Sequence, residues 1–539
     1  MSASKELRIR CSIYDLQMEY DQGNKQPLED LVRAWIGIKN LPSTDKRSFF
    51  VLGGYHGEPF QYRKAVDDLS SVDGYTYWGG YCNHGNVLFP TWHRVYLLKL
   101  EDALQSIVPG VTMPYWDETS EESRKRGIPS ILTQAEFELD GETINNPFRS
   151  FVVPVALTDF EQANERLWEK PNGYETVRYP LSGLVGTAEA RAATQAHNAK
   201  YPDPIENIKY LNQNIVTWLT GTKPEISYDP NPKPSPPEPP SPKAVYAEYQ
   251  NCLRAPNYTV FSNSTSAAQW NLDHPDASLA VTPLESPHND IHLAIGGFDM
   301  PSAPFQFEAG KITGANGDMG ENNTAAMDPI FFFHHCHVDR MFWLWQKQNG
   351  FTDQFDILTG YAGTSSSDSQ GPTPGIAPGT PLDMDTPLNP FVKDLLGTAY
   401  TSRDCINVET QLGYTYAPGS LEEKVPNPQP VTSGFSTKKL TVRGVDRAVF
   451  QGSFVLYAYA EVVNNEGKSS TYYLGHHSVL SRRNLIKCAN CLTHLEVIAH
   501  FPLSSIPADL VDGARYYVTV QHRGEKSYGE FKYTCEVTS

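Results

Sequence analysis

Residues 328–340 read DPIFFFHHCHVDR, a run that begins with apolar side chains and then places three histidines and a cysteine within four positions. A single helix face is formed further along by His335, Val338, Phe342 and Trp345. Apolar residues at this spacing are typical of a buried helix, whereas a dense histidine cluster is hard to explain as hydrophobic core. The stretch therefore predicts a helix that carries a metal site into the interior.

Two further groups of histidines have positions suited to shared metal ligation. His288 and His292 are four residues apart, so both rings leave the same face of a helix. A comparable set in the first half of the chain consists of His56, His84 and His93. In both halves a phenylalanine precedes the last histidine by one helical turn. The pattern predicts two similar half-sites.

The ligand type restricts the metal. Imidazole suits zinc, copper, iron and nickel, whereas magnesium and calcium prefer carboxylate oxygens. Three neutral histidines without a carboxylate leave zinc or copper, and a pair of such sites favours copper.

Composition excludes several other classes of function. The 539 residues carry 44 Lys+Arg against 62 Asp+Glu, a net charge of −18, which argues against nucleic acid or an anionic membrane as partner. The sequence has no apolar run of about 18 residues and no recognisable secretion signal at its start. We therefore expect a cytoplasmic protein whose eight cysteines are reduced.

The pattern of apolar residues changes from helix-like to strand-like toward the end of the sequence. Helical periodicity marks residues 27–36 and 89–104, whereas residues 454–463 and 516–521 are rich in β-branched and aromatic side chains. A stretch rich in Pro, Ser and Glu, without helical or strand periodicity, separates the two parts. We expect three parts: a mainly α-helical domain over 1–418, a cleavable linker over 419–435 and a β-sandwich-like domain over 436–539.

The residues now match a known family. Residues 84–101, HGNVLFPTWHRVYLLKLE, and residues 328–339, DPIFFFHHCHVD, resemble the two copper signatures of tyrosinases, catechol oxidases and molluscan haemocyanins. The whole chain is similar to filamentous-fungal pro-tyrosinases, with Tyr414-Thr415-Tyr416 closing the catalytic body. The resemblance implies a mainly α catalytic domain, with a four-helix bundle around a dicopper site, and a β-rich C-terminal domain.

The resemblance also implies roles for single residues. One copper ion would be held by His56, His84 and His93, and the other by His288, His292 and His335. The second of two adjacent histidines is the ligand in the family's second signature, which selects His335 over His334. His337 would lie beside the site or at the surface.

Three further assignments follow from the same resemblance. Cys82 would form a thioether with His84, the alternative being a buried free thiol. Glu285 and Asn289 would hold a water that takes the phenol proton, the alternative being a helix N-terminal acid and a polar surface residue. Cys488 and Cys491, in a Cys-x-x-Cys motif, would serve copper uptake, the alternative being a plain thiol pair.

The C-terminal domain would cover the coppers. Related precursors insert a large apolar side chain over the metals, and the matching loop at residues 476–480 offers Val479 or Leu480 as this active-site plug. The predicted function is thus a latent tyrosinase of melanin or pigment formation, which oxidises monophenols and o-diphenols to o-quinones with O2. A catechol oxidase without monophenolase activity and a haemocyanin-like oxygen carrier remain alternatives, and a homo-oligomer is compatible with the family.

Overall fold

The computed structural model describes most of the chain. It leaves undescribed residues 1–6, 58–79, 159–160, 163–164, 167–168, 184–187, 222–240, 242, 277–279, 301–313, 369–372, 374, 428–430, 451, 464–466, 468, 483–494, 523–528 and 539. Within the described ranges, none of the helices has the length and hydrophobicity needed to cross a bilayer.

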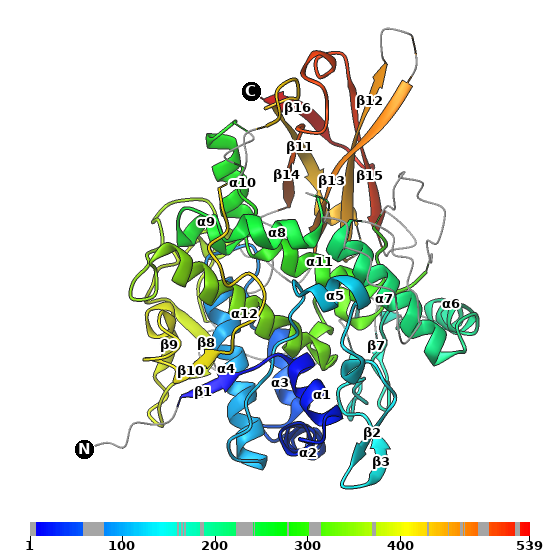
Figure 1. Cartoon of the computed structure of the whole chain (residues 1–539), viewed down its shortest axis with the longest axis vertical. Coiled ribbons are helices and arrows are strands. Elements are labelled where there is room, and N and C mark those ends of the chain that lie inside the picture. The colour runs from blue at the N-terminus through cyan, green and yellow to red at the C-terminus, as the bar shows by residue number, and fades with distance from the viewer. Residues whose placement is uncertain are drawn as a thin grey trace.

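Helices form the body of the protein (Figure 1). They are α1 (Ile13–Asp21), α2 (Gln26–Asn40), α3 (Phe49–His56), α4 (Phe89–Ile107), α5 (Glu121–Arg126), α6 (Ala188–Asn198), α7 (Pro204–Thr220), α8 (Val245–Cys252), α9 (Tyr258–Ser262), α10 (Ser264–Asp273), α11 (Glu285–Gly296) and α12 (Ile330–Asn349). The helices predicted around residues 27–36, 89–104 and 335–345 are confirmed as α2, α4 and α12.

Local sequence sets the ends of the helices that carry the histidines. Pro90 lies in the first turn of α4, where its missing N–H would have no helical partner. Gly297 and Gly350 follow α11 and α12 in the left-handed conformation, with φ of 109° and 77°, which ends each helix at little steric cost. Long buried helices with fixed ends can hold side chains in a constant position.

Short strands accompany the helical body, and longer ones form the C-terminal domain. The former are β1 (Arg8–Arg10), β2 (Glu136–Leu139), β3 (Glu142–Asn145), β4 (Leu157–Thr158), β5 (Glu161–Gln162), β6 (Glu165–Arg166), β7 (Glu169–Lys170), β8 (Pro387–Val392), β9 (Ala399–Thr401) and β10 (Tyr414–Tyr416). The latter are β11 (Lys439–Asp446), β12 (Phe454–Val463), β13 (Ser469–Val479), β14 (Glu496–Pro502), β15 (Arg515–His522) and β16 (Thr534–Thr538).

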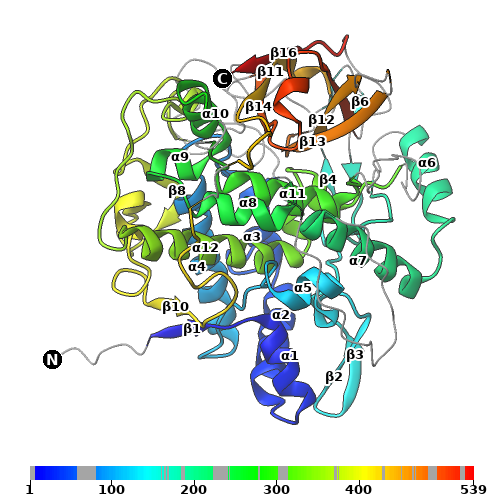
Figure 2. The same ribbon diagram turned by 45° about the horizontal axis from the view of Figure 1, so that its top comes forward.

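The C-terminal strands form two antiparallel sheets, ordered β14-β11-β16 and β13-β12-β15, with an apolar core between them. The predicted sandwich is therefore confirmed. Along β12, Leu456 and Ala458 face this core, whereas Val455, Tyr457 and Tyr459 join the core of the helical body. Period-2 alternation thus gives the β13-β12-β15 sheet two buried faces, and the second faces the helices near α8 and α11 (Figures 1 and 2).

The Tyr414-Thr415-Tyr416 motif closes the helical body by pairing in parallel with β1. The hydroxyls of Tyr414 and Tyr416 donate to Asp339 Oδ2 at 2.5 and 2.6 Å. Arg94 Nε donates to Asp339 Oδ1 at 2.5 Å. This buried network, centred on the ion pair of Arg94 and Asp339, ties α4, α12 and β10 together.

The segment after β10 stays attached to the helical body at first. Ser420 N donates to Asp117 Oδ2 at 2.8 Å, Arg340 Nη2 lies 2.6 Å from Glu422 Oε1, and Val425 is buried. Within the predicted linker, the described residues exposed to solvent are 419, 423–424, 426–427 and 432–435. The longest exposed run among these residues, 432–435, lies in the second half of the segment, where a protease has its best access.

Candidate metal centre

Four helices and one loop bring the candidate histidines into one buried region. His56 ends α3, His84 precedes α4, and His93 lies in the first turns of α4. Helix α11 carries His288 and His292, and the fourth helix, α12, carries the adjacent pair His334 and His335. All of these side chains are buried. The structure thus brings together the six histidines named from the sequence.

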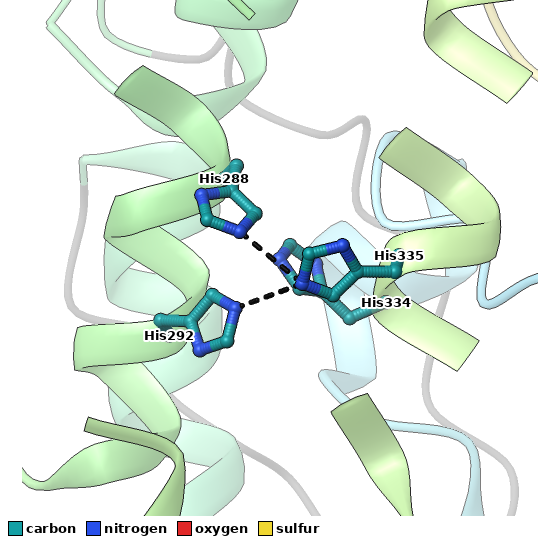
Figure 3. A group of neighbouring side chains, drawn as sticks. All are labelled: His288, His292, His334 and His335. Carbon is teal, nitrogen blue, oxygen red and sulfur yellow. Dashed lines mark hydrogen bonds between the residues drawn. The ribbon is translucent and has the colours of Figure 1, made fainter. Parts of the chain in front are cut away.

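In the second half-site, ring nitrogens of His288, His292 and His335 converge (Figure 3). His335 Nε2 lies 3.2 Å from His288 Nε2 and 3.1 Å from His292 Nε2. His292 Nδ1 donates to the carbonyl of Met319 at 2.8 Å, so Nε2 of this neutral ring carries a lone pair and no proton. One proton cannot satisfy three facing lone pairs, whereas a cation can.

His334 belongs to the same cluster but is held differently. Its Nδ1 lies 2.5 Å from Glu118 Oε1, and Tyr249 donates to the other oxygen of Glu118 at 2.7 Å. Burial raises the pKa of Glu118 to about 8. His335 Nε2 faces both histidines of α11, while His334 is held by Glu118, which agrees with the preference for His335. Nothing in the sequence around Glu118 indicated this contact.

The first half-site has its donors arranged in the same way. His56 Nδ1 donates to the carbonyl of Asn322 at 3.1 Å, and His93 Nδ1 donates to that of Phe89 at 2.8 Å. Both Nε2 atoms, and both ring nitrogens of His84, are buried without a hydrogen-bond partner. Burial lowers the pKa of His93 to about 3, so its ring is neutral at pH 7. Orphaned neutral imidazoles are suited to copper or zinc.

The two half-sites face each other. The rings of His93 and His335 are stacked with centroids 4.6 Å apart, and those of His84 and His288 are 5.6 Å apart. Phe331 stacks on His335 at 3.9 Å, and Phe89 lies 4.9 Å from His93. The two phenylalanines one turn before the last histidines therefore support the ligand rings. His337 is also buried, so of its two predicted places the surface is wrong.

Glu285 and Asn289 both lie buried on α11, so the alternative of a surface Asn289 is wrong. Glu285 accepts hydrogen bonds from the backbone N–H groups of Gly85 and Ser264 at 2.7 and 2.8 Å. Asn289 Oδ1 accepts from His288 Nδ1 at 3.0 Å. Glu285 thus anchors the loop that carries His84 of the first half-site, and Asn289 orients a histidine of the second.

Cys82 is a buried free cysteine in the structure. Its sulfur lies 3.8 Å from Asn322 Nδ2 and 3.5 Å from Arg482 Nη2, which comes from the C-terminal domain. The thioether to His84 stays a prediction. Arg482 was not found from the sequence, because an arginine 400 positions away gives no signal of this contact.

The C-terminal segment at residues 478–482 contacts residues beside both half-sites. Asn289 Nδ2 donates to the carbonyl of Ser478 at 3.4 Å, and Arg482 reaches Cys82. Leu480, between them, is buried in the core of the helical body, whereas Val479 is buried in the core of the sandwich. Of the two predicted plug residues, only Leu480 packs with the helical body. Cys488 and Cys491 lie outside the described residues.

Comparison with known proteins gives a consistent result. The family model described as the common central domain of tyrosinase matches residues 46–348. A tyrosinase of Hahella sp. (strain CCB-MM4) is 66% identical over 97% of this chain and 93% of its own length. A tyrosinase of Aspergillus oryzae (strain ATCC 42149 / RIB 40) is 42% identical over 93% of this chain and 89% of its own.

A solved structure is similar over nearly the same extent. The tyrosinase from Burkholderia thailandensis at low pH condition has a TM-score of 0.86 and 59% identity, and the match covers 98% of this chain and 100% of that one. Together with the two buried histidine clusters, which fit a dicopper centre, these matches are decisive. The chain belongs to the tyrosinase family of copper-dependent oxidases that act on monophenols and diphenols.

Proposed function

We propose that one copper ion is held by His56, His84 and His93 and the other by His288, His292 and His335. The convergence of buried, unprotonated Nε2 atoms supports this assignment, because each lacks any other adequate partner. Bound copper supplies the redox chemistry with O2 that hydroxylates a phenol at the ortho carbon and oxidises a catechol to an o-quinone.

Residues of α11 then control the phenol proton. A phenol has a pKa of about 10, so hydroxylation at neutral pH requires a proton acceptor. Burial raises the pKa of Glu285, which makes this carboxyl group a better acceptor. Its Oε1 accepts one backbone hydrogen bond, from Gly85, and has capacity for a water. We place that water between Glu285 and Asn289.

The enzyme is latent in its full-length form, and residues 478–482 keep substrate away from the copper pair. The observation that carries this proposal is the position of this segment, which contacts Asn289 beside one half-site and Cys82 beside the other. Leu480 lies between these two contacts and is buried with the catalytic core. A covered centre would limit the release of reactive quinones, the precursors of melanin-type pigments, until the cover is removed.

Limited proteolysis tests the latency. Cutting within residues 426–435 should raise the oxygen uptake of the copper-loaded chain with tyrosine and with DOPA, because the C-terminal domain can then dissociate. Mass spectrometry locates the cut, and a chain cut elsewhere in the helical body serves as the control. If the intact chain at pH 7 is as active as the cut chain, the C-terminal domain does not inhibit the enzyme.

A further inference from the structure

A second group of metal-ligand side chains lies outside the histidine half-sites, where the C-terminal domain meets the helical body. Glu248 comes from α8, Asp290 from α11 and His476 from β13, which lie close together in Figure 2. His476 Nε2 is 2.9 Å from Asp290 Oδ2 and 4.0 Å from Glu248 Oε1. The three ligand atoms all lie within 4.8 Å of one another.

This group is distinct from the dicopper centre although it shares helix α11. Asp290 is two residues from both His288 and His292, and two residues correspond to a rotation of about 200° around a helix. Its side chain therefore leaves the helix on the face opposite the copper ligands. There it meets α8 and the C-terminal domain, and it is almost fully buried.

The charge of the group is not balanced by basic side chains. Across the described part of the chain, His476 is the single basic residue within ion-pair distance of either carboxylate. Glu248 Oε2 is buried and has no hydrogen-bond partner. Burial and the neighbouring Asp290 raise the pKa of Glu248 well above its usual value. A buried carboxylate and a largely buried one at this distance need either a shared proton or a cation to offset their repulsion.

The imidazole of His476 is oriented for ligation. Its Nδ1 lies 3.1 Å from the hydroxyl of Tyr473, and Trp218 packs edge-on against the ring at 5.0 Å. When Nδ1–H donates to Tyr473, the lone pair of Nε2 points toward the two carboxylates. A hydrogen bond of this kind at the outer ring nitrogen is typical of metal-binding histidines.

We propose that Glu248, Asp290 and His476 form a third metal site, which binds one divalent cation of the zinc type. Two carboxylate oxygens and one imidazole are ligands that zinc accepts, and its charge balances the two carboxylates. Glu248 Oε2 or a water completes a four-coordinate site. Because the ligands come from α8, α11 and β13, the ion fastens the C-terminal domain to the helix that carries two copper ligands.

Elemental analysis of the full-length chain tests the site. The protein is loaded with two equivalents of copper, then equilibrated with zinc and freed of unbound metal, because excess copper(II) would compete for the same ligands. We expect two copper ions and about one zinc ion per chain. Glu248→Gln and His476→Gln should each lose the zinc and keep both coppers. His500→Gln is the matched control, because His500 also contacts the helical body, through the carbonyl of Ala268 at 3.2 Å, but lies outside the cluster.

Two additional experiments distinguish a metal ion bound by the Glu248–Asp290–His476 group from one bound by Cys488 and Cys491. Cobalt replacing zinc should give the visible absorption of a four-coordinate ion with oxygen and nitrogen ligands, and this signal should disappear in Glu248→Gln. A double substitution of Cys488 and Cys491 to Ser should leave the third metal in place. Absence of zinc from the wild-type chain, or loss of zinc with the cysteines but not with Glu248→Gln, would overturn the site.

The readout also separates this site from the proposed latency. Metal content and the cobalt spectrum do not depend on whether the C-terminal domain inhibits the enzyme. A chain that holds the third metal in the cluster but shows full activity before proteolysis keeps the metal site and refutes the latency.

Discussion

The substitution Leu480→Ala tests most directly the proposal that residues 478–482 keep substrate away from the copper pair. Leu480 is 2% exposed and packs with the catalytic core. The substitution removes three carbons, and at about 0.8 kcal/mol for each buried methylene the closed state loses about 2.4 kcal/mol. In the closed form residues 478–482 lie on the catalytic core, and in the open form the C-terminal domain has moved away. Since about 1.4 kcal/mol corresponds to a factor of ten, the equilibrium between these forms should shift about 50-fold toward the open form.

The assay is oxygen uptake with a catechol by the copper-loaded chain at pH 7, before and after cleavage of the linker. The activity of the intact variant should rise by up to about 50-fold, limited by the activity of the cut enzyme. The cut enzyme itself should be unchanged, because the substituted residue is then released with the C-terminal domain. Leu480→Met keeps the buried volume and should stay latent. Leu396→Ala is a surface control, because Leu396 is 94% exposed.

Two results would refute this reasoning. Equal activity of intact wild type and intact Leu480→Ala, both far below the cut enzyme, would show that another contact maintains the closed state. A fall in the activity of the cut variant would show that the substitution damages the catalytic domain rather than its cover.

Four further predictions can be checked separately. His335→Ala should lose copper together with activity, measured by elemental analysis, because one metal keeps only two protein ligands. If Cys82 forms a thioether with His84, the peptide that contains both residues resists alkylation and is two hydrogens lighter by mass spectrometry. Asn289→Gly should depress monophenol oxidation more than catechol oxidation, measured as the ratio of initial rates, whereas equal losses would indicate a purely structural role. Burial lowers the pKa of His500 to about 3, below the roughly 6.5 of an exposed histidine. Its contribution to domain docking is therefore complete above pH 6.5 and is lost as the pH falls toward 3. Brief exposure to pH 4 should open the intact chain, measured as activity at pH 7, and His500→Gln should weaken this effect.

The helices and the half-sites could be predicted because their signals are local. The four-residue spacing of His288 and His292 and the apolar stripe around His335 follow directly from the 3.6-residue period of a helix. The sandwich was predictable for the same reason, since β-branched runs such as residues 454–463 mark strands without reference to their partners.

The side-chain contacts that surround the histidine clusters could not be predicted in this way. Glu118 meets His334 across 216 positions, and Arg482 meets Cys82 across 400. A single charged residue has no period, and its burial depends on how helices and sheets pack. The sequence therefore indicated which residues could ligate copper but not which side chains support or cover them.

The choice between Val479 and Leu480 depends on an irregularity in β13. Tyr473 packs with the helical body and Leu474 with the sandwich, and the pairing with β12 then shifts so that Gly475 lies opposite Ala458. Gly475 has a φ of 143°, a conformation that side chains rarely adopt. A bulge of this kind adds one residue and reverses which side chains face each side.

Beyond the bulge, even-numbered residues face the helices. His476 reaches Asp290, Ser478 meets Asn289, and Leu480 enters the catalytic core, whereas Val479 turns into the sandwich. Simple alternation continued from Tyr473 would have directed Val479 toward the helical body instead. The bulge therefore determines which side chain, Leu480 rather than Val479, packs with the helical body as the proposed cover, and which histidine completes the proposed third metal site. One backbone irregularity thus underlies both proposals.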